Sequence, residues 1–301
     1  MISILIPVYN RDVNQLASQL SRQLSNLSGS GEIIFFDDAS AERSRRINAA
    51  IATLPHIRYL QANVNQGRIR IRQLLAEKAA YDWLLFLDCD SQVLLQTFLE
   101  KYCRQLPHDP AVFVGGRIYS QEPPADCAHR LHWKYGSKRE AVDPAKRNED
   151  PYPGFMSNNF MVHKNIFNQL SFVSDWQGYG HEDTWIGMQL EKQGVSIIYI
   201  DNVVLHDGLE RVEVFIPKSE QALRNLIRLQ QLVPAATLRR HVKLYRAYSR
   251  LKSTGLLWMP RFIYRMMRKR IFDNLESCNP SLFYFDLYRL YQFIQLLRPH
   301  K

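Results

Sequence analysis

The first 90 residues alternate between short apolar runs and segments whose apolar residues recur at helical spacing. Mostly apolar runs over 2–8, 32–36, 57–60 and 83–87 predict buried strands. Helices are predicted between them over 11–27, 40–52 and 68–80, and the first carries leucines at 16, 20, 24 and 27. This order predicts a Rossmann-like α/β fold, with a mostly parallel sheet flanked by helices on both faces.

The pattern changes twice in the rest of the chain. Residues 120–153 are rich in proline, charge and aromatics and predict a loop-rich insertion, whereas 160–162 and 197–200 predict strands around a helix at 182–193 that Gly194 ends. Beyond residue 210 glycine becomes rare. Helices are predicted there over 241–252, 260–275 and 282–297, with breaks at Pro234, Pro260 and Pro280. We therefore expect two parts, an α/β domain over 1–210 and a helical extension over 211–301.

Charge divides along the same boundary. The net charge of +10 splits into +13 over 211–301 and −3 over the remainder. A basic, aromatic-rich extension favours an anionic partner. We prefer an anionic membrane surface, while nucleic acid and a simple packed extension with a solvated basic face remain the alternatives.

The cysteines and the apolar runs bear on location. The four cysteines at 89, 103, 127 and 278 lack zinc-site spacing and predict free thiols in a reducing compartment. The apolar N-terminus is too short and uncharged for a signal peptide, and no run approaches the roughly 18 apolar residues of a membrane span. We expect a cytoplasmic protein, peripheral on the inner face of the plasma membrane.

Polar groups follow three predicted strands, at Tyr9-Asn10, Asp37-Asp38 and Asp88-Cys89-Asp90. Ligands of parallel α/β sheets bind beyond the carboxyl ends of the strands. Two carboxylates two residues apart at a strand end can face one side, and hard cations such as Mg²⁺ and Mn²⁺ bind such carboxylates together with substrate phosphates. The alternative is a solvated turn that caps the next helix, but the position after a hydrophobic strand favours the metal site.

A second group of candidate residues is Gly178-Tyr-Gly-His-Glu-Asp183. Its two glycines permit a close backbone approach, and its two acids open a predicted helix. Adjacent helical residues point about 100° apart, so only one acid can face a given reacting atom. The alternative is that both acids only interact favourably with the positive end of the helix dipole and have no role in the reaction. His206, after the last strand of the α/β part, is either a metal ligand or a structural histidine.

Five segments in order resemble the family 2 glycosyltransferases, which have the GT-A fold. They are Ser3–Arg11, Phe36–Ser40, Asn65–Gln73, Leu85–Ser91 and Gly178–Asp183. The resemblance implies an inverting, metal-dependent enzyme that moves a sugar from a nucleotide-diphospho-sugar, preferably a UDP-sugar. The acceptor is a hydroxyl in surface polysaccharide, lipopolysaccharide or related glycan biosynthesis. The chain lacks the Q-x-x-R-W signature of processive synthases, which favours transfer of a single sugar.

The resemblance also implies residue roles. Nucleotide binding falls to Pro7, Tyr9, Asp38, Gly67, Arg72 and Asp88, and a Mn²⁺ or Mg²⁺ ion to Asp90 with His206. Asp183 matches the catalytic base, and Glu182 the residue that binds the acceptor, a glycan or lipid-linked glycan. Gly115, Gly116, Asn158 and Asn159 fall where the family shapes the sugar and acceptor pocket, with ordinary turn chemistry as the alternative. Ile71-Arg72-Gln73 departs from the family's Ala-Arg-Asn. The contact made by the third residue, here Gln73, is therefore in question, whereas the arginine matches.

Two other functions fit the sequence less well. A sugar-phosphate nucleotidyltransferase needs a glycine-rich N-terminal loop over the triphosphate, and Tyr9-Asn10-Arg11-Asp12 contains no glycine. A non-enzymatic basic protein that binds nucleic acid or membrane would not need a net acidic, motif-bearing body.

Overall fold

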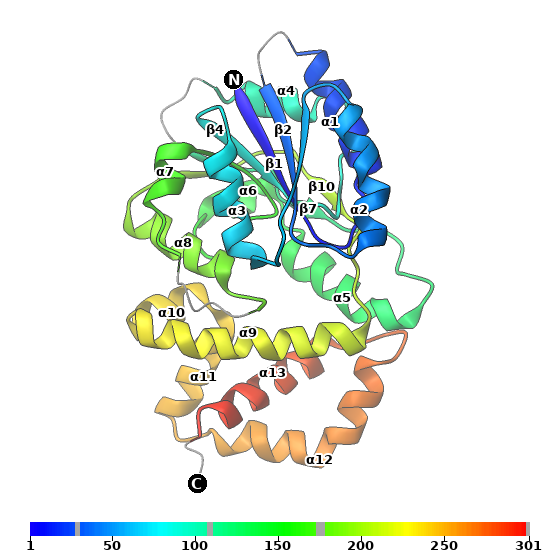
Figure 1. Ribbon diagram of the computed structural model, residues 1–301. Coiled ribbons are helices and arrows are strands. Elements are labelled where there is room, and N and C mark those ends of the chain that lie inside the picture. Colours follow the sequence, from blue (N-terminus) through cyan, green and yellow to red (C-terminus); the bar gives the residue numbers. More distant parts are fainter. Residues whose placement is uncertain (28–30, 107–110, 173–177, 299–301) are drawn as a thin grey trace.

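The computed structural model describes residues 1–27, 31–106, 111–172 and 178–298. A sheet with helices on both faces forms the upper part of the molecule in Figure 1, and the C-terminal helices form a layer beneath it. The α/β architecture predicted from the sequence is confirmed.

The central sheet has seven strands in the order β3-β2-β1-β4-β8-β6-β9. They are β1 (Ile2–Val8), β2 (Gly31–Asp37), β3 (Ile57–Gln61), β4 (Trp83–Leu87), β6 (Val112–Val114), β8 (Asn159–His163) and β9 (Ile197–Tyr199). The strands β1 to β4 are parallel, β8 is antiparallel to both its neighbours, and β9 is parallel to β6. The sheet is thus mostly parallel, as predicted. A second sheet of order β5-β10-β7 joins β5 (Ser91–Gln92), β7 (Arg117–Ile118) and β10 (Val204–His206).

Helices cover both faces of the central sheet. One core contains α1 (Asn14–Ser25) and α4 (Phe98–Cys103), and the other contains α3 (Gly67–Lys78), α7 (Lys164–Gln169) and α8 (Glu182–Lys192). In β1, Ile4 and Ile6 belong to the first core and Leu5 to the second, because alternate strand residues point to opposite faces. The helix predicted over 40–52 is α2 (Glu42–Asn48) followed by a 3₁₀ turn over Ala49–Thr53.

The insertion predicted as loop-rich contains short helices. A 3₁₀ turn (Cys127–His129), α5 (Arg130–Tyr135), a π-helical turn (Gly136–Glu140) and α6 (Pro144–Glu149) follow one another. Side chains of Asp126 and Asp143 accept hydrogen bonds from the backbone amides of Ala128 and Ala145 and cap two of these turns. Elements this short span less than two helical turns, so the apolar period gave no signal for them.

The C-terminal part is helical, as predicted. It comprises α9 (Val212–Leu232), α10 (Ala235–His241), α11 (Lys243–Ser253), α12 (Trp258–Leu275) and α13 (Leu282–Leu296). The long α9 was not predicted. The break predicted at Pro260 agrees with the structure, because α11 and α12 are separate helices and Pro260 lies in the first turn of α12, where backbone amides have no intrahelical acceptor. Among the described residues, no helix combines the length and apolar content needed to cross a membrane.

Helix α9 packs against both parts of the molecule. Leu223 and Leu226 share a core with Met188 of α8 and with α10, α11 and α13, whereas Phe215 shares another with Leu131 of α5 and with α12 and α13. The division between residues 210 and 211 stays a prediction.

The prediction of four free cysteines is wrong. Cys127 and Cys278 form a disulfide with their Cα atoms 4.5 Å apart, whereas Cys89 and Cys103 are free. The bonded residues are separated by 151 positions and meet only because α12 and α13 fold back against α5. Sequence spacing therefore gave no sign of the pair.

Removing this disulfide should destabilise the protein. Closing a loop of this length restricts the unfolded chain, so the double variant Cys127→Ser, Cys278→Ser should lose up to about 5 kcal/mol of unfolding free energy. Urea unfolding of the oxidised protein measures the loss. Reductant should lower the midpoint of the parent protein and leave the double variant unchanged. Equal midpoints for the oxidised parent and the variant would contradict the prediction.

Candidate active site

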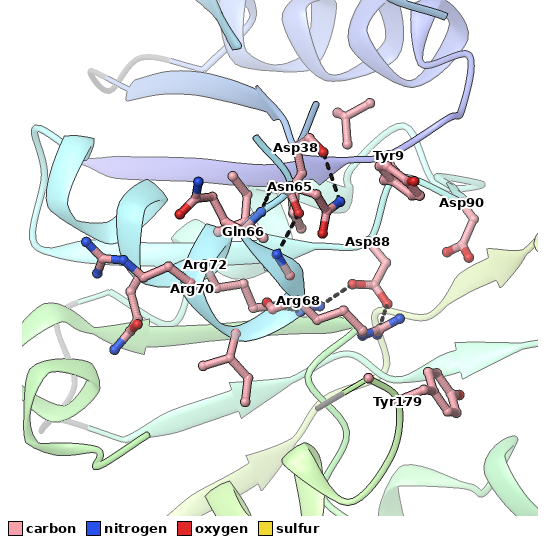
Figure 2. Close-up of a pocket in the computed structure, with 18 of the residues that line it drawn as sticks. Tyr9, Asp38, Asn65, Gln66, Arg68, Arg70, Arg72, Asp88, Asp90 and Tyr179 are labelled. Carbon is pink, nitrogen blue, oxygen red and sulfur yellow. Dashed lines mark hydrogen bonds and ion pairs between the residues drawn. The ribbon is translucent and has the colours of Figure 1, made fainter. Parts of the chain in front are cut away.

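A pocket of about 870 Å³ opens at the carboxyl ends of β1, β2 and β4, between the start of α3 and the side of α9. All six residues predicted to bind nucleotide line it, namely Pro7, Tyr9, Asp38, Gly67, Arg72 and Asp88. Figure 2 shows how Tyr9, Asp38, Arg72 and Asp88 approach from separate elements. Pro7 and Asp88, which are 81 positions apart in the chain, thus meet at one edge of the sheet, as expected of a parallel α/β sheet.

Asp38 shapes the wall of the pocket. Its carboxylate accepts hydrogen bonds from the backbone amides of Gln66 (2.6 Å) and Gly67 (3.0 Å) at the start of α3. Burial raises the pKa of Asp38, although these two amides favour its ionised form. Its neighbour Asp37 is fully buried and accepts hydrogen bonds from the amide of Ser40 and the hydroxyl of Tyr59. Asp37 therefore stabilises the turn after β2, and Asp38 stabilises the start of α3.

Asp88 lies between two arginines of α3. Nη2 of the buried Arg72 donates to Oδ1 of Asp88 at 2.5 Å, and Nη2 of Arg68 lies 3.8 Å from Oδ2. The Arg68 side chain is 43% exposed and lines the pocket, so its guanidinium remains accessible to an anionic ligand. Arginine presents a planar set of donors that suits phosphate oxygens.

Arg68 also connects this wall to α8. Its Nε lies 3.1 Å from Oε1 of Glu182, and its guanidinium carbon is 5.3 Å from the ring centroid of Tyr179. Arg68 lies within the motif Asn65–Gln73, but no role was predicted for it. Its position directly after Gly67, in the first turn of a predicted helix, was the sequence signal that could have indicated a place in the pocket.

The two acids of α8 have different environments. Glu182 is buried, and burial raises its pKa despite the nearby Arg68. Asp183 is half-buried and accepts a hydrogen bond from the hydroxyl of Ser157. Neither acid belongs to the described lining of the pocket, but the ion pair with Arg68 holds Glu182 beside it.

Helix α9 holds the loop that leads into α8. Gly180 has φ = 102°, and a Cβ on it would lie 2.4 Å from Cβ of Ala222 in α9, so only glycine fits there. The side chain of Gln221 accepts a hydrogen bond from the amide of Tyr179 at 3.0 Å. Lys218 and Gln221 of α9 also line the pocket. This wall was not predicted from the sequence, because α9 itself was not predicted.

The two predicted metal ligands lie together. Antiparallel pairing of β5 with β10 places Ser91 opposite His206, and Nδ1 of His206 is 3.4 Å from Oδ1 of Asp90. Burial would raise the pKa of Asp90, but His206 and the nearby Arg117 outweigh it and hold that pKa below its usual range. A Cβ on Gly208 would lie 2.3 Å from Oδ2 of Asp90, so a side chain there would intrude on the pair.

The pair fits a divalent cation. Oδ1 of Asp90 and Nε2 of His206 are buried without a hydrogen-bond partner among the described residues. Carboxylate oxygen suits Mg²⁺ and Mn²⁺, and imidazole suits transition metals. The described ranges contain no cluster of three or more His, Cys, Asp or Glu side chains that could hold a metal. A bound ion would therefore need further ligands from phosphate or water.

The four residues predicted to shape the sugar and acceptor pocket are not among the residues that line the 870 Å³ pocket. Asn159 is buried, and its amide nitrogen donates to the carbonyls of Gly116 (3.0 Å) and Asn202 (2.9 Å). A Cβ on Gly115 would lie 2.3 Å from the carbonyl oxygen of Asn202. Gly115, Gly116 and Asn159 therefore pack the strand ends here. The backbone carbonyl of the buried Asn158 accepts a hydrogen bond from the amide of Asp88 at 2.9 Å. The side-chain oxygen of Asn158 has no partner among the described residues. A substrate role for these residues stays a prediction.

Comparison with known proteins places the chain among glycosyltransferases. Residues 3–170, more than half of the chain, match the family model described as glycosyl transferase family 2. An uncharacterized glycosyltransferase of Haemophilus influenzae is 32% identical over 114 residues, which span 37% of this chain and 36% of that protein. A second from the same organism is 35% identical over 94 residues, spanning 30% of this chain and 36% of that protein. The matches thus cover little more than a third of either relative.

Solved structures share the architecture. The mannosyltransferase PcManGT from Pyrobaculum calidifontis, in complex with GDP-Man and Mn²⁺, has a TM-score of 0.57 at 13% identity and matches 98% of this chain and 86% of its own. Glucosyl-3-phosphoglycerate synthase from Mycobacterium tuberculosis has a TM-score of 0.51 at 14% identity, over 76% of this chain and 79% of its own. At these identities the likeness shows the fold, which is GT-A. The family match, which extends over more than half of the chain, shows that the chain belongs to glycosyl transferase family 2.

Proposed function

We propose that the protein transfers a single sugar, with inversion, from a nucleotide-diphospho-sugar to a hydroxyl of a glycan or lipid-linked glycan. One observation carries the proposal. The six residues that the motifs assign to the nucleotide line a single pocket, although they come from three strand ends and from α3. We place the reaction in the biosynthesis of surface polysaccharide, lipopolysaccharide or a related glycan.

The donor would lie along this pocket. Tyr9 is 55% exposed and lines the pocket, and its ring can offer a surface on which a nucleobase stacks. Arg68, Arg72 and Lys218 supply positive charge for the diphosphate. UDP is our preferred nucleotide. Structures of similar fold are described with UDP and Mn²⁺ or Mg²⁺, and another with GDP-Man and Mn²⁺.

Asp90 and His206 are the residues that would hold Mn²⁺ or Mg²⁺ in this chain. When bound, such an ion supplies Lewis-acid neutralisation of the charge on the departing diphosphate. Arg68 adds protein-borne positive charge on the side of the pocket nearest Asp88.

The acids of α8 would serve the acceptor. Asp183 takes the proton of the acceptor hydroxyl as that oxygen bonds to the anomeric carbon, while the bond from that carbon to the diphosphate breaks on the opposite face. The hydrogen bond from Ser157 fixes the orientation of Asp183. Glu182, held by Arg68, binds a second acceptor hydroxyl, and Gly115, Gly116, Asn158 and Asn159 support the sugar pocket. In this proposal residues 211–301 form a helical extension that docks on an anionic membrane at the inner face of the plasma membrane.

Nucleotide binding tests the proposal first. The purified protein is titrated with UDP, GDP, CDP and dTDP, each with and without Mn²⁺, and heat of binding and thermal shift are recorded. We expect one nucleotide to bind and the metal to strengthen its binding. Saturation at about 100 times Kd should add roughly 2.7 kcal/mol of stability. The corresponding nucleoside is the control, because it lacks the phosphates that the arginines and the metal would contact. Absence of binding by all four diphosphates under both conditions would refute the donor site.

A further inference from the structure

The start of α12 exposes an unusual set of apolar side chains. Of the sixteen large hydrophobic residues exposed in the described chain, six lie between positions 256 and 266. They are Leu256, Trp258, Met259, Phe262, Ile263 and Met266, which we call the α12 patch. Trp258, Phe262 and Met266 follow one another at four-residue spacing and therefore lie on one side of the helix. A cluster of exposed apolar side chains on a folded protein marks a surface that binds something apolar.

The opposite side of α12 is already used for packing. Tyr264, Ile271 and Leu275 are buried in a core shared with α13 and α5. Figure 1 shows α12 along the lower edge of the molecule, with α13 above it. The α12 patch is therefore an outer face of the helical layer.

Positive charge borders the patch. Arg265, Arg268, Lys269 and Arg270 are exposed on the same helix, which has Asp273 as its one acid. Arg261 lies within the patch itself. An interfacial helix binds a membrane through apolar side chains that enter the acyl region and through cations that meet anionic headgroups, and the solvent-exposed side of α12 carries both kinds of side chain.

A basic groove lies just before the patch in the chain. Arg239 and Arg240 of α10, Arg246 and Arg250 of α11 and three polar residues line a cavity of about 630 Å³. Its last lining residue, Ser253, precedes Trp258 by only the turn that contains Gly255. Asp150 is the one carboxylate in its described lining, and it pairs with Arg240 at 2.7 Å. The groove therefore extends the positive surface beyond the apolar patch.

We propose that the α12 patch is a membrane-docking face that inserts Trp258, Phe262 and Met266 into an anionic bilayer. The adjoining arginines and lysine then contact lipid phosphates. A second protein copy would cover the apolar side chains, but its own cations would then lie against the arginines and lysine of the first copy. An anionic bilayer matches both the apolar and the charged features. This assignment rests on the proposed docking of residues 211–301 and names the segment responsible.

Vesicle binding tests the face directly. The full-length protein is sedimented with vesicles of phosphatidylcholine mixed with phosphatidylglycerol, and with vesicles of phosphatidylcholine alone. We expect strong binding only to the mixed vesicles. The variant Phe262→Ser, Met266→Ser should bind about tenfold more weakly or worse, because it removes two large apolar groups from the bilayer. The variant Arg265→Gln, Lys269→Gln should lose about fivefold per charge at low salt.

A matched control removes exposed apolar groups elsewhere. Leu94 and Ile198 are 52% and 40% exposed in the α/β part. The variant Leu94→Ser, Ile198→Ser should bind vesicles like the parent protein. Both apolar variants should also bind the nucleotide identified above unchanged, because none of these residues lines the pocket. A protein that binds vesicles but no nucleotide would refute the donor site and leave the docking face intact.

Trp258 reports its own insertion. The parent protein should show a blue shift of tryptophan emission with mixed vesicles, and Trp258→Phe should bind equally while losing most of that shift. Equal vesicle binding by the parent and by Phe262→Ser, Met266→Ser would overturn the proposal. So would failure of the parent to bind mixed vesicles. A dimer in light scattering that the same double variant dissociates would assign the patch to a second copy instead.

Discussion

Replacing Asp183 by asparagine should lower turnover by roughly 10²–10⁴-fold, the range expected when a general base is lost. Asparagine has the same shape and can still accept the hydrogen bond that Ser157 donates. It cannot take a proton from an acceptor hydroxyl. The loss should therefore appear in kcat, while the affinity for the nucleoside diphosphate stays at the parent value.

The measurement is release of nucleoside diphosphate from the donor that the titrations identify, in the presence of acceptor. Ser157→Ala is the matched comparison, because it removes the orienting contact and keeps the carboxylate. Its loss should be well below that of Asp183→Asn. Glu182→Gln should raise the acceptor KM more than it lowers kcat, because its proposed role is binding. Near-normal turnover by Asp183→Asn would show that another group accepts the proton.

Most of the α/β part could be predicted because its signals are local. Apolar runs such as Ile2–Val8 mark strands covered on both faces, and the acids that follow them mark the edge where strand ends meet. Asp88 is an example. Its position after β4 predicted a place in the pocket, but only the structure shows that Arg72 and Arg68 share its carboxylate.

The features that escaped prediction depend on contacts between distant segments. Cys127 meets Cys278 through the packing of α12 and α13 against α5, which no spacing rule encodes. Likewise α9 closes the pocket with Lys218 and Gln221, and Pro217 within it obscured the helix in the sequence. The carbonyls that accept hydrogen bonds from the side-chain amide of Asn159 belong to residues 43 positions away on either side, so no local pattern predicted these contacts.

Replacing Asp90 by asparagine should abolish most of the strengthening that Mn²⁺ gives to nucleotide binding. Substitutions in the outer shell of a metal site commonly cost 10–100-fold in affinity, so loss of a direct carboxylate ligand should cost about tenfold or more. Affinity in the absence of metal should change little, since the arginines around Asp88 are untouched. Titration of nucleotide with and without Mn²⁺ separates the two effects.

Two further variants decide whether the effect belongs to the metal site. Gly208→Ala places a methyl group against Oδ2 of Asp90 and should reproduce the loss without removing any ligand. Asp207→Asn is the control, because Asp207 is an exposed neighbouring acid that pairs with Arg11 and does not line the pocket. It should retain the full response to Mn²⁺. If Asp90→Asn and Gly208→Ala both keep that response, Asp90 is not a metal ligand. The positive charge needed at the diphosphate would then have to come from protein side chains, and Arg68 and Lys218 line the pocket and could supply it.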